Sequence, residues 1–222
     1  MASEQSGGWR AAAEQAMAMV FGSSCVVCGD LGGTVCATCE PVVDLQRRTL
    51  PGGLTCFSGG QWADDTAMLM LALKEDGVTR VARHLAPLLA AAHGSASASG
   101  VAAADATLVP VPTRMAADRR RGYRPVEVLL RAAGLPFQRV LRVARTVRDQ
   151  RELSRDERVR NTLGAFAVRK TRAEAGPVIL VDDVVTTGAT LENSAQTLRS
   201  AGFTVVASIT VLSTPKRLIR NS

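Results

Sequence analysis

The residues best suited to chemistry follow a short apolar run, Val178–Val181. Two adjacent acids, Asp182 and Asp183, come directly after it, and the small-residue segment Thr186–Thr190 comes next. Four apolar residues are typical of a central parallel strand buried on both faces, and ligands bind at the carboxyl end of such strands. The small-residue segment passes into a predicted helix, whose free N–H groups and dipole favour a bound phosphate.

Acids beside a phosphate site repel the ligand unless they have another role. Asp182 and Asp183 can accept hydrogen bonds from a sugar diol, near a divalent cation that offsets the charge. Gly188 lets the backbone approach a ligand closely, and the threonine hydroxyls around it add donors. The alternative is an acid pair that caps a helix after an ordinary core strand. No GxGxxG or GxxxxGK[ST] segment occurs, which argues against dinucleotide-binding and P-loop proteins.

A second cluster lies near the N-terminus, where two CxxC pairs are separated by seven residues. Its members are Cys25, Cys28, Cys36 and Cys39. Four thiolates at this spacing predict one tetrahedral Zn²⁺ site, closed by protein ligands and therefore structural. The alternative is a redox CxxC pair, for which a single pair suffices. We interpret Cys56 as a core residue, while His84 and His93 have no ligand partner at a useful spacing.

The net charge of +7 comes from one segment of the 222-residue chain. Residues 114–172 hold 17 Lys and Arg against 6 Asp and Glu, and 16 of the 17 cations are arginine. Arginine suits forked contacts with phosphate, which predicts either a nucleic acid, single- or double-stranded, or a polyphosphorylated small molecule as partner. The alternative is a solvated helix face.

Composition narrows the class of protein. Hydrophobic residues make up 46% of the chain and charged residues 21%, as in folded globular proteins. No apolar run reaches the ~20 residues of a membrane span, so we expect no membrane insertion. The N-terminus carries Glu4 and Glu14 and lacks a basic segment before an apolar one, which argues against a secretory signal. These features predict a cytoplasmic protein.

The elements that must position these residues alternate between strands and helices. This alternation predicts an α/β fold with a doubly wound parallel sheet flanked by helices. A small polar stretch, 94–105, predicts a flexible surface linker. The predicted strands are 54–58, 106–111, 164–168, 178–181 and 204–210. The predicted helices are 9–21, 62–74, 78–92, about 125–133, parts of 138–163, and about 188–200.

The acid pair and the segment after it resemble the phosphoribosyl pyrophosphate (PRPP) signature of type I phosphoribosyltransferases. The pattern is four apolar residues, two acids, any two residues, two Ser/Thr, Gly, any residue and Ser/Thr, and every position is filled. The resemblance implies that Asp182 and Asp183 hold the ribose 2′- and 3′-hydroxyls and that Thr186–Thr190 hold the 5′-phosphate. The PRPP-binding segment after the acids would comprise Val184, Val185, Thr186, Thr187, Gly188, Ala189 and Thr190.

The similarity extends to the ComF family, whose members join an N-terminal cysteine cluster to a type I phosphoribosyltransferase-like domain. The matching stretches are Val109–Pro112 with Arg114, then Arg121-Gly122-Tyr123, then Arg145-Thr146, Gln150, Leu153, Arg158, Asn161 and Gly164–Phe166. Lys74 stands where the family has a Lys near the end of its first helix. The departures are Arg124, where Asn is usual, and Glu75, where an aromatic is usual.

The resemblance implies roles for further residues. The pyrophosphate loop would be Val111, Pro112, Thr113 and Arg114, and the Arg-rich segment 142–160 would close over pyrophosphate, with Arg145 and Arg158 as catalytic candidates. Lys74 and Arg121 are further candidates. Breaking the bond between C1 and pyrophosphate builds negative charge on the leaving group, which Mg²⁺ and arginines stabilise.

We therefore expect two domains, a helix and zinc module over 1–53 and a phosphoribosyltransferase-like domain over 54–222. The leading hypothesis is a Mg²⁺-dependent protein that binds PRPP and transfers its phosphoribosyl group to an unidentified nitrogen acceptor. The alternative is a PRPP-sensing or DNA-associated protein of the competence type, without turnover. In a third interpretation the zinc module is a docking surface for a protein partner, such as a component of the competence machinery.

Overall fold

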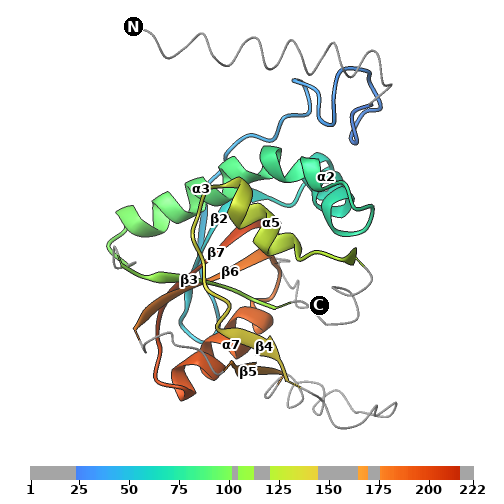
Figure 1. Ribbon diagram of the computed structural model, residues 1–222. Coiled ribbons are helices and arrows are strands. Elements are labelled where there is room, and N and C mark those ends of the chain that lie inside the picture. The colour runs from blue at the N-terminus through green and yellow to red at the C-terminus, as the bar shows by residue number, and fades with distance from the viewer. Residues whose placement is uncertain (1–23, 102–104, 113–120, 145–164, 170–175, 216–222) are drawn as a thin grey trace, which may run out of the picture.

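A five-stranded sheet forms the centre of the computed structural model (Figure 1), which describes residues 24–101, 105–112, 121–144, 165–169 and 176–215. The strand order is β1-β2-β7-β6-β3. The four strands β2, β7, β6 and β3 run parallel, and β1 is antiparallel to β2. The strands are β1 Gln46–Thr49, β2 Thr55–Gln61, β3 Thr107–Pro110, β6 Pro177–Val185 and β7 Thr204–Ser213.

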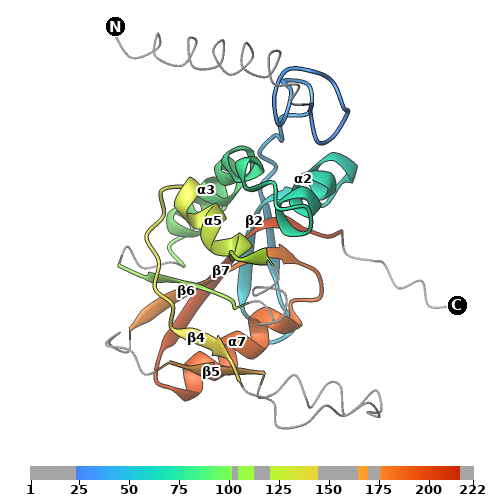
Figure 2. The ribbon, with the colours of Figure 1, turned by 45° about the vertical axis from the view of Figure 1, so that its right-hand side comes forward.

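Helices cover both faces of this sheet (Figures 1 and 2). One face carries α2 (Asp64–Lys74), α3 (Ala82–Ala98) and α5 (Pro125–Ala132), with the short 3₁₀ helix η1 (Thr79–Val81) before α3. The other face carries α7 (Ala189–Ser200). A small antiparallel pair, β4 (Leu141–Val143) and β5 (Phe166–Val168), lies beside α7. This three-layer architecture confirms the predicted α/β fold.

The middle of the sheet is apolar because its strands are buried on both faces. Along β6, Ile179 and Val181 join the core cluster under α3 and α5, while Val178 and Leu180 join the cluster under α7. At Gly59 in β2 an added Cβ would overlap the Leu88 carbonyl oxygen of α3. Only glycine allows this helix to lie so close to the strand.

Several predicted elements need correction. Residues 94–98 belong to α3 and are not a linker, because small side chains there, such as the fully buried Ala96, let the helix continue against its neighbours. Residues 141–143 form a strand where helix was expected, and the predicted strand 164–168 pairs with it instead of joining the main sheet. β1 was missed, since Gln46–Thr49 has no apolar alternation and is stabilised by pairing with β2.

The predicted helix 9–21 and the region 145–163 lie outside the described residues. The division at residue 53 stays a prediction, with β1 forming part of the central sheet. Among the described helices, none combines the length and the hydropathy needed to cross a membrane.

Candidate functional site

The predicted acid pair lies at the carboxyl edge of the sheet, within the last four residues of β6. Strand β6 runs to Val185, so the acids belong to the strand instead of following it. The last residue of α2, Lys74, reaches the same edge, and its Nζ lies 2.7 Å from Oδ2 of Asp183. The structure therefore brings together Asp182, Asp183 and Lys74, although about a hundred residues of chain separate the lysine from the acids.

Backbone N–H groups hold the two carboxylates in place. The Asp183 N–H donates to Oδ1 of Asp182 at 2.9 Å, and the Val184 N–H donates to Oδ1 of Asp183 at 2.7 Å. Loss of solvation, together with the neighbouring charge of Asp183, raises the pKa of Asp182 to about 8. The charge of Lys74 opposes this rise only in part. Asp182 is therefore the acid whose charge changes near neutral pH.

This raised pKa predicts a pH dependence. PRPP affinity should increase between about pH 6 and about pH 9, because Asp182 becomes the charged, stronger acceptor above its pKa. The increase should flatten in Asp182→Asn, and calorimetry across this pH range on both proteins measures the difference.

The carboxyl group of Asp182 should also affect folding stability. The free energy of unfolding should fall as the pH rises from the ordinary pKa of an aspartate through about 8, because the folded state holds the proton more tightly than the unfolded chain. Identical pH profiles of wild type and Asp182→Asn would contradict the assignment of the raised pKa to Asp182.

The segment after the acids forms a turn that leads into α7. Gly188 adopts φ +86° at the N-cap of this helix, a conformation that side chains rarely adopt. The Ala189 N–H donates to the Thr187 hydroxyl at 3.3 Å. Thr186, Thr187 and Thr190 are exposed, so the N-terminus of α7 opens to solvent as a phosphate site requires.

The β1–β2 hairpin packs against this turn. A Cβ at Gly188 would come within 2.6 Å of Leu50, whose side chain covers the glycine. The Gly52 N–H of the hairpin turn donates to the Glu192 carboxylate in the first turn of α7. The hairpin thereby fixes the start of α7, a role that the sequence analysis did not assign to residues 50–52.

The predicted pyrophosphate loop begins beside the acid pair. The Val111 N–H donates to the Val181 carbonyl at 2.8 Å, which continues the β3–β6 pairing, and Val111 is buried. Pro112 is half-buried next to it. Thr113 and Arg114 lie outside the described residues, as do Arg145 and Arg158, so their predicted roles stay predictions.

The two departures from the family pattern are both ion-paired. Glu75 lies 2.6 Å from Nη2 of Arg121, whose side chain is only 10% exposed, and Arg124 lies 3.1 Å from Glu127. The Tyr123 hydroxyl donates to the Leu73 carbonyl. Arg121 therefore braces the end of α2 next to Lys74.

Glu127 is a residue that the sequence analysis missed. This carboxylate is buried in α5, and Arg139 grips it with Nε at 2.7 Å and Nη2 at 2.5 Å. Burial favours a raised pKa, but the guanidinium groups of Arg139 and Arg124 outweigh it and lower the pKa of Glu127. The group lies against Pro110–Pro112 and supports the start of the predicted pyrophosphate loop. The sequence did contain a signal for this residue, because Glu127 is a charged residue on the apolar face of a predicted helix.

The four predicted zinc ligands come together in space. Their sulfur atoms all lie within 4.8 Å of one another, close enough to surround one ion. Tight turns hold them, with the Gly29 N–H donating to the Cys25 carbonyl at 2.9 Å and the Cys39 N–H to the Cys36 carbonyl at 3.0 Å. Burial favours a raised pKa for Cys25, but nearby backbone N–H groups lower it to about 6. Burial and the neighbouring thiols raise the pKa of Cys39, so a cation is needed to hold all four as thiolates.

The cysteine cluster packs onto the main domain. Cys25 and Cys39 belong to the core cluster under α3, and Glu40 lies 2.6 Å from Nδ1 of His84 in that helix. His84 therefore has a partner that its sequence spacing did not indicate. Cys56 is fully buried, which confirms its interpretation as a core residue.

Comparison with known proteins agrees with this geometry. Residues 119–221 match the phosphoribosyl transferase domain family. The chain is 30% identical to competence protein F of Haemophilus influenzae over 150 residues, which cover 64% of this chain and 66% of that protein, slightly less than two thirds of its length.

Two solved structures align with most of this chain. Orotate phosphoribosyltransferase from Aeropyrum pernix is 20% identical, with a TM-score of 0.35 over 78% of this chain and 76% of that chain. An adenine phosphoribosyltransferase is 16% identical, with a TM-score of 0.38 over 76% of this chain and 84% of that chain.

The parallel sheet and the turn at its carboxyl edge, together with the family match over residues 119–221, fit a phosphoribosyltransferase-type domain. The similarity to competence protein F and the cluster of four cysteines fit a ComF-like protein.

Proposed function

We propose that this protein binds PRPP together with Mg²⁺ and transfers the phosphoribosyl group to a nitrogen acceptor. The observation that carries the proposal is the arrangement of Asp182 and Asp183 at the end of β6, directly before the open N-terminus of α7. Carboxylates there accept from a ribose diol, and the turn donates to the 5′-phosphate. The phosphoribosyl transferase domain match supports PRPP as the ligand.

Each part of the site has a task in this proposal. The carboxylates are oxygen ligands of the kind Mg²⁺ prefers, and bound Mg²⁺ would offset the charge that develops on the leaving pyrophosphate. Lys74 forms an ion pair with Asp183 at 2.7 Å and holds that carboxylate at the edge of the site. Val111–Arg114 would hold the pyrophosphate, and Arg145 and Arg158 would close over it. The four cysteines would hold a structural Zn²⁺.

A second candidate function has its own support. The printed name of the homologue, competence protein F, and the Arg-rich segment 114–172 favour a PRPP-sensing or DNA-associated protein in the cytoplasm, without turnover. In that case the segment tracks a nucleic-acid backbone, or the cysteine module docks a protein of the competence machinery.

One assay separates the two candidates. We expect the purified protein, given PRPP and Mg²⁺, to release pyrophosphate with at least one member of a nucleobase panel. The control is the Asp182→Asn and Asp183→Asn double variant, which should release none above the uncatalysed rate. PRPP binding without release for any base, together with DNA affinity that falls with salt, would contradict the enzyme and support the sensor.

A further inference from the structure

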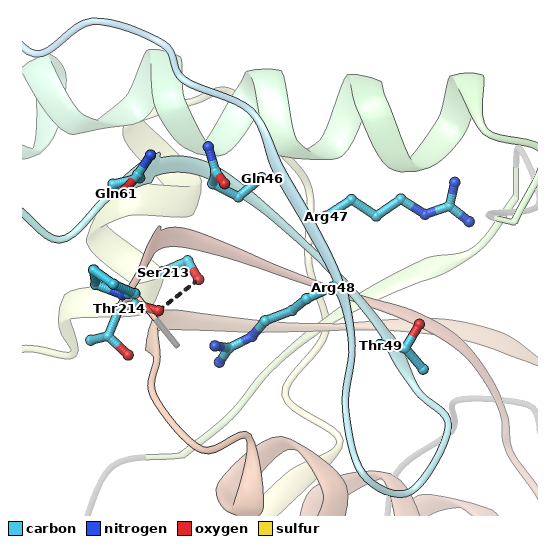
Figure 3. A pocket seen from close by; sticks show the side chains of 8 residues that line it. Gln46, Arg47, Arg48, Thr49, Gln61, Ser213 and Thr214 are labelled. Carbon is cyan, nitrogen blue, oxygen red and sulfur yellow. Dashed lines mark hydrogen bonds between the residues drawn. The ribbon is translucent and has the colours of Figure 1, made fainter. Parts of the chain in front are cut away.

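A cavity of about 450 Å³ lies at the carboxyl edge of the sheet, beside the end of β6 (Figure 3). Its position follows from the strand register, because Gln46 of β1, Gln61 of β2 and Ser213 of β7 all lie at this edge. The Thr214 N–H donates to the Val185 carbonyl at 3.0 Å, which joins the cavity wall to the end of β6. The lining residues are Gln46, Arg47, Arg48, Thr49, Gln61, Ser213, Thr214 and Pro215.

Arg48 is the charged group whose side chain extends toward Ser213 and Thr214 in this cavity (Figure 3). Its Nη2 donates to the Thr186 carbonyl at 2.5 Å. Its Nε is buried and has no hydrogen-bond acceptor. Within the described residues no carboxylate pairs with this guanidinium. Protein atoms enclose this Nε, so a ligand in the cavity would contact the Nη groups of the guanidinium. Arg48 is thus placed for an anion that the described part of the chain does not supply.

The neighbouring arginine is arranged differently. The Arg47 guanidinium lies 5.5 Å from the centre of the Phe57 ring and points away from Ser213 (Figure 3). The two glutamines of the cavity supply acceptors. The amide nitrogens of Gln46 and Gln61 donate to Asp44 at 2.9 Å and 2.8 Å, which leaves their carbonyl oxygens for a ligand. The cavity therefore combines one forked cation with oxygen acceptors.

We propose that this cavity binds a phosphate monoester, with the phosphate on Arg48 and an N–H-bearing group on the glutamine carbonyls. A guanidinium matches phosphate through two parallel hydrogen bonds. The volume is within the range of small-molecule sites and exceeds that of a phosphate group alone. The ligand class is thus a small organic phosphate with nitrogen donors, such as a nucleotide.

This site is separate from the 5′-phosphate turn. Arg48 contacts the carbonyl oxygen of Thr186, and in a trans peptide the following N–H, that of Thr187, points the opposite way. The Thr187 N–H of the turn therefore faces away from Arg48. A ligand on Arg48 would hold the first residue of the turn without occupying it.

Nuclear magnetic resonance of the ¹⁵N-labelled full chain tests the proposal. Inorganic phosphate and adenosine 5′-monophosphate are added separately, with PRPP and Mg²⁺ present in excess to fill the turn and chloride added to match ionic strength. We expect saturable shifts of the Arg48 Nε–H signal and of the Thr49, Ser213 and Thr214 amides. Tighter binding of the monophosphate than of inorganic phosphate supports the proposal. Equal binding would show that the glutamine carbonyls take no part and would overturn it.

Two variants make the result specific to Arg48. Arg48→Gln should weaken phosphate binding at least roughly tenfold, because a charge-assisted hydrogen bond is lost. Arg47→Gln removes an equal charge from the same strand and should change the affinity by less than about twofold, since exposed charges are screened. Equal weakening in both variants would reduce the effect to general electrostatics and overturn the proposal.

Failure of this site is distinguishable from failure of PRPP binding. Shifts at Thr186–Thr190 on addition of PRPP and Mg²⁺ report the turn, while shifts at Arg48 report the cavity. If phosphate shifts the Arg48 signal only when PRPP is absent, Arg48 belongs to the PRPP site and the proposal of a second site is wrong. If PRPP does not shift the Thr186–Thr190 signals while phosphate still shifts the Arg48 signal, the proposed phosphate site in the cavity is supported and the proposed function is wrong.

Discussion

Replacing Asp182 and Asp183 together with asparagine is expected to lower PRPP affinity at least roughly a hundredfold and to leave the fold intact. Each amide keeps the shape of the carboxylate and one acceptor oxygen, but it loses the charge that strengthens the bond to a ribose hydroxyl. Hydrogen bonds to charged groups are worth about 1.5–3 kcal/mol each, and at about pH 9, where Asp182 carries its charge, two such bonds lose it. The variant also leaves Lys74 without its partner at 2.7 Å. Calorimetry with PRPP and Mg²⁺ measures the loss.

Two control variants accompany this experiment. Asp65→Asn removes an exposed acid from the first turn of α2 and should leave PRPP affinity unchanged. Thr187→Val should weaken binding less than the double variant, because the backbone donors of the turn remain. Wild-type affinity in the Asp182→Asn and Asp183→Asn protein would show that the acids are only structural, and the proposed function would be wrong.

Removal of either cysteine pair is expected to abolish zinc binding. We expect about one Zn²⁺ per chain, and Cys25→Ser combined with Cys28→Ser should leave none, because two ligands cannot close a tetrahedral site. Binding free energies of structural zinc are about 10–16 kcal/mol, so the cysteine module should unfold while the α/β domain stays folded. Elemental analysis measures the metal, and limited proteolysis together with circular dichroism locates the unfolding.

Cys56→Ser provides the matched control. Cys56 is fully buried, and Ser58 and Thr210 next to it are joined by a hydrogen bond of 2.7 Å, so a hydroxyl is tolerated there. Its pKa is raised by burial, which keeps the thiol neutral. The variant should retain the full zinc content. Protein purified without chelator that contains no zinc would contradict the proposed metal site.

The sequence predicted the parts of this protein that local patterns determine. The apolar run Val178–Val181 predicted a buried central strand, and the paired CxxC spacing predicted the cysteine cluster that the structure forms. The helix 125–133 was predicted within one residue, because Pro125 starts it and Gly134 follows it. In these cases short-range chemistry and the tertiary structure agree.

Contacts between distant segments could not be predicted in this way. Nothing near Lys74 in the sequence indicates that its ammonium group meets Asp183, and nothing near Arg48 indicates that it meets the turn at Thr186. β1 is a strand because β2 offers it an edge, which no local pattern records. Glu127 was missed for a related reason, since its partner Arg139 follows the helix in an irregular segment.

The packing of Leu50 against Gly188 affects the entropy of ligand binding. Because the hairpin holds the turn through Leu50 and through the bond from Gly52 to Glu192, the turn acquires its shape when the chain folds, before any ligand arrives. A preorganised turn loses little conformational entropy on association, so more of the interaction energy with a phosphate remains as affinity. The same packing leaves no room for a side chain at position 188. Substitutions in the hairpin and in the turn should therefore affect each other.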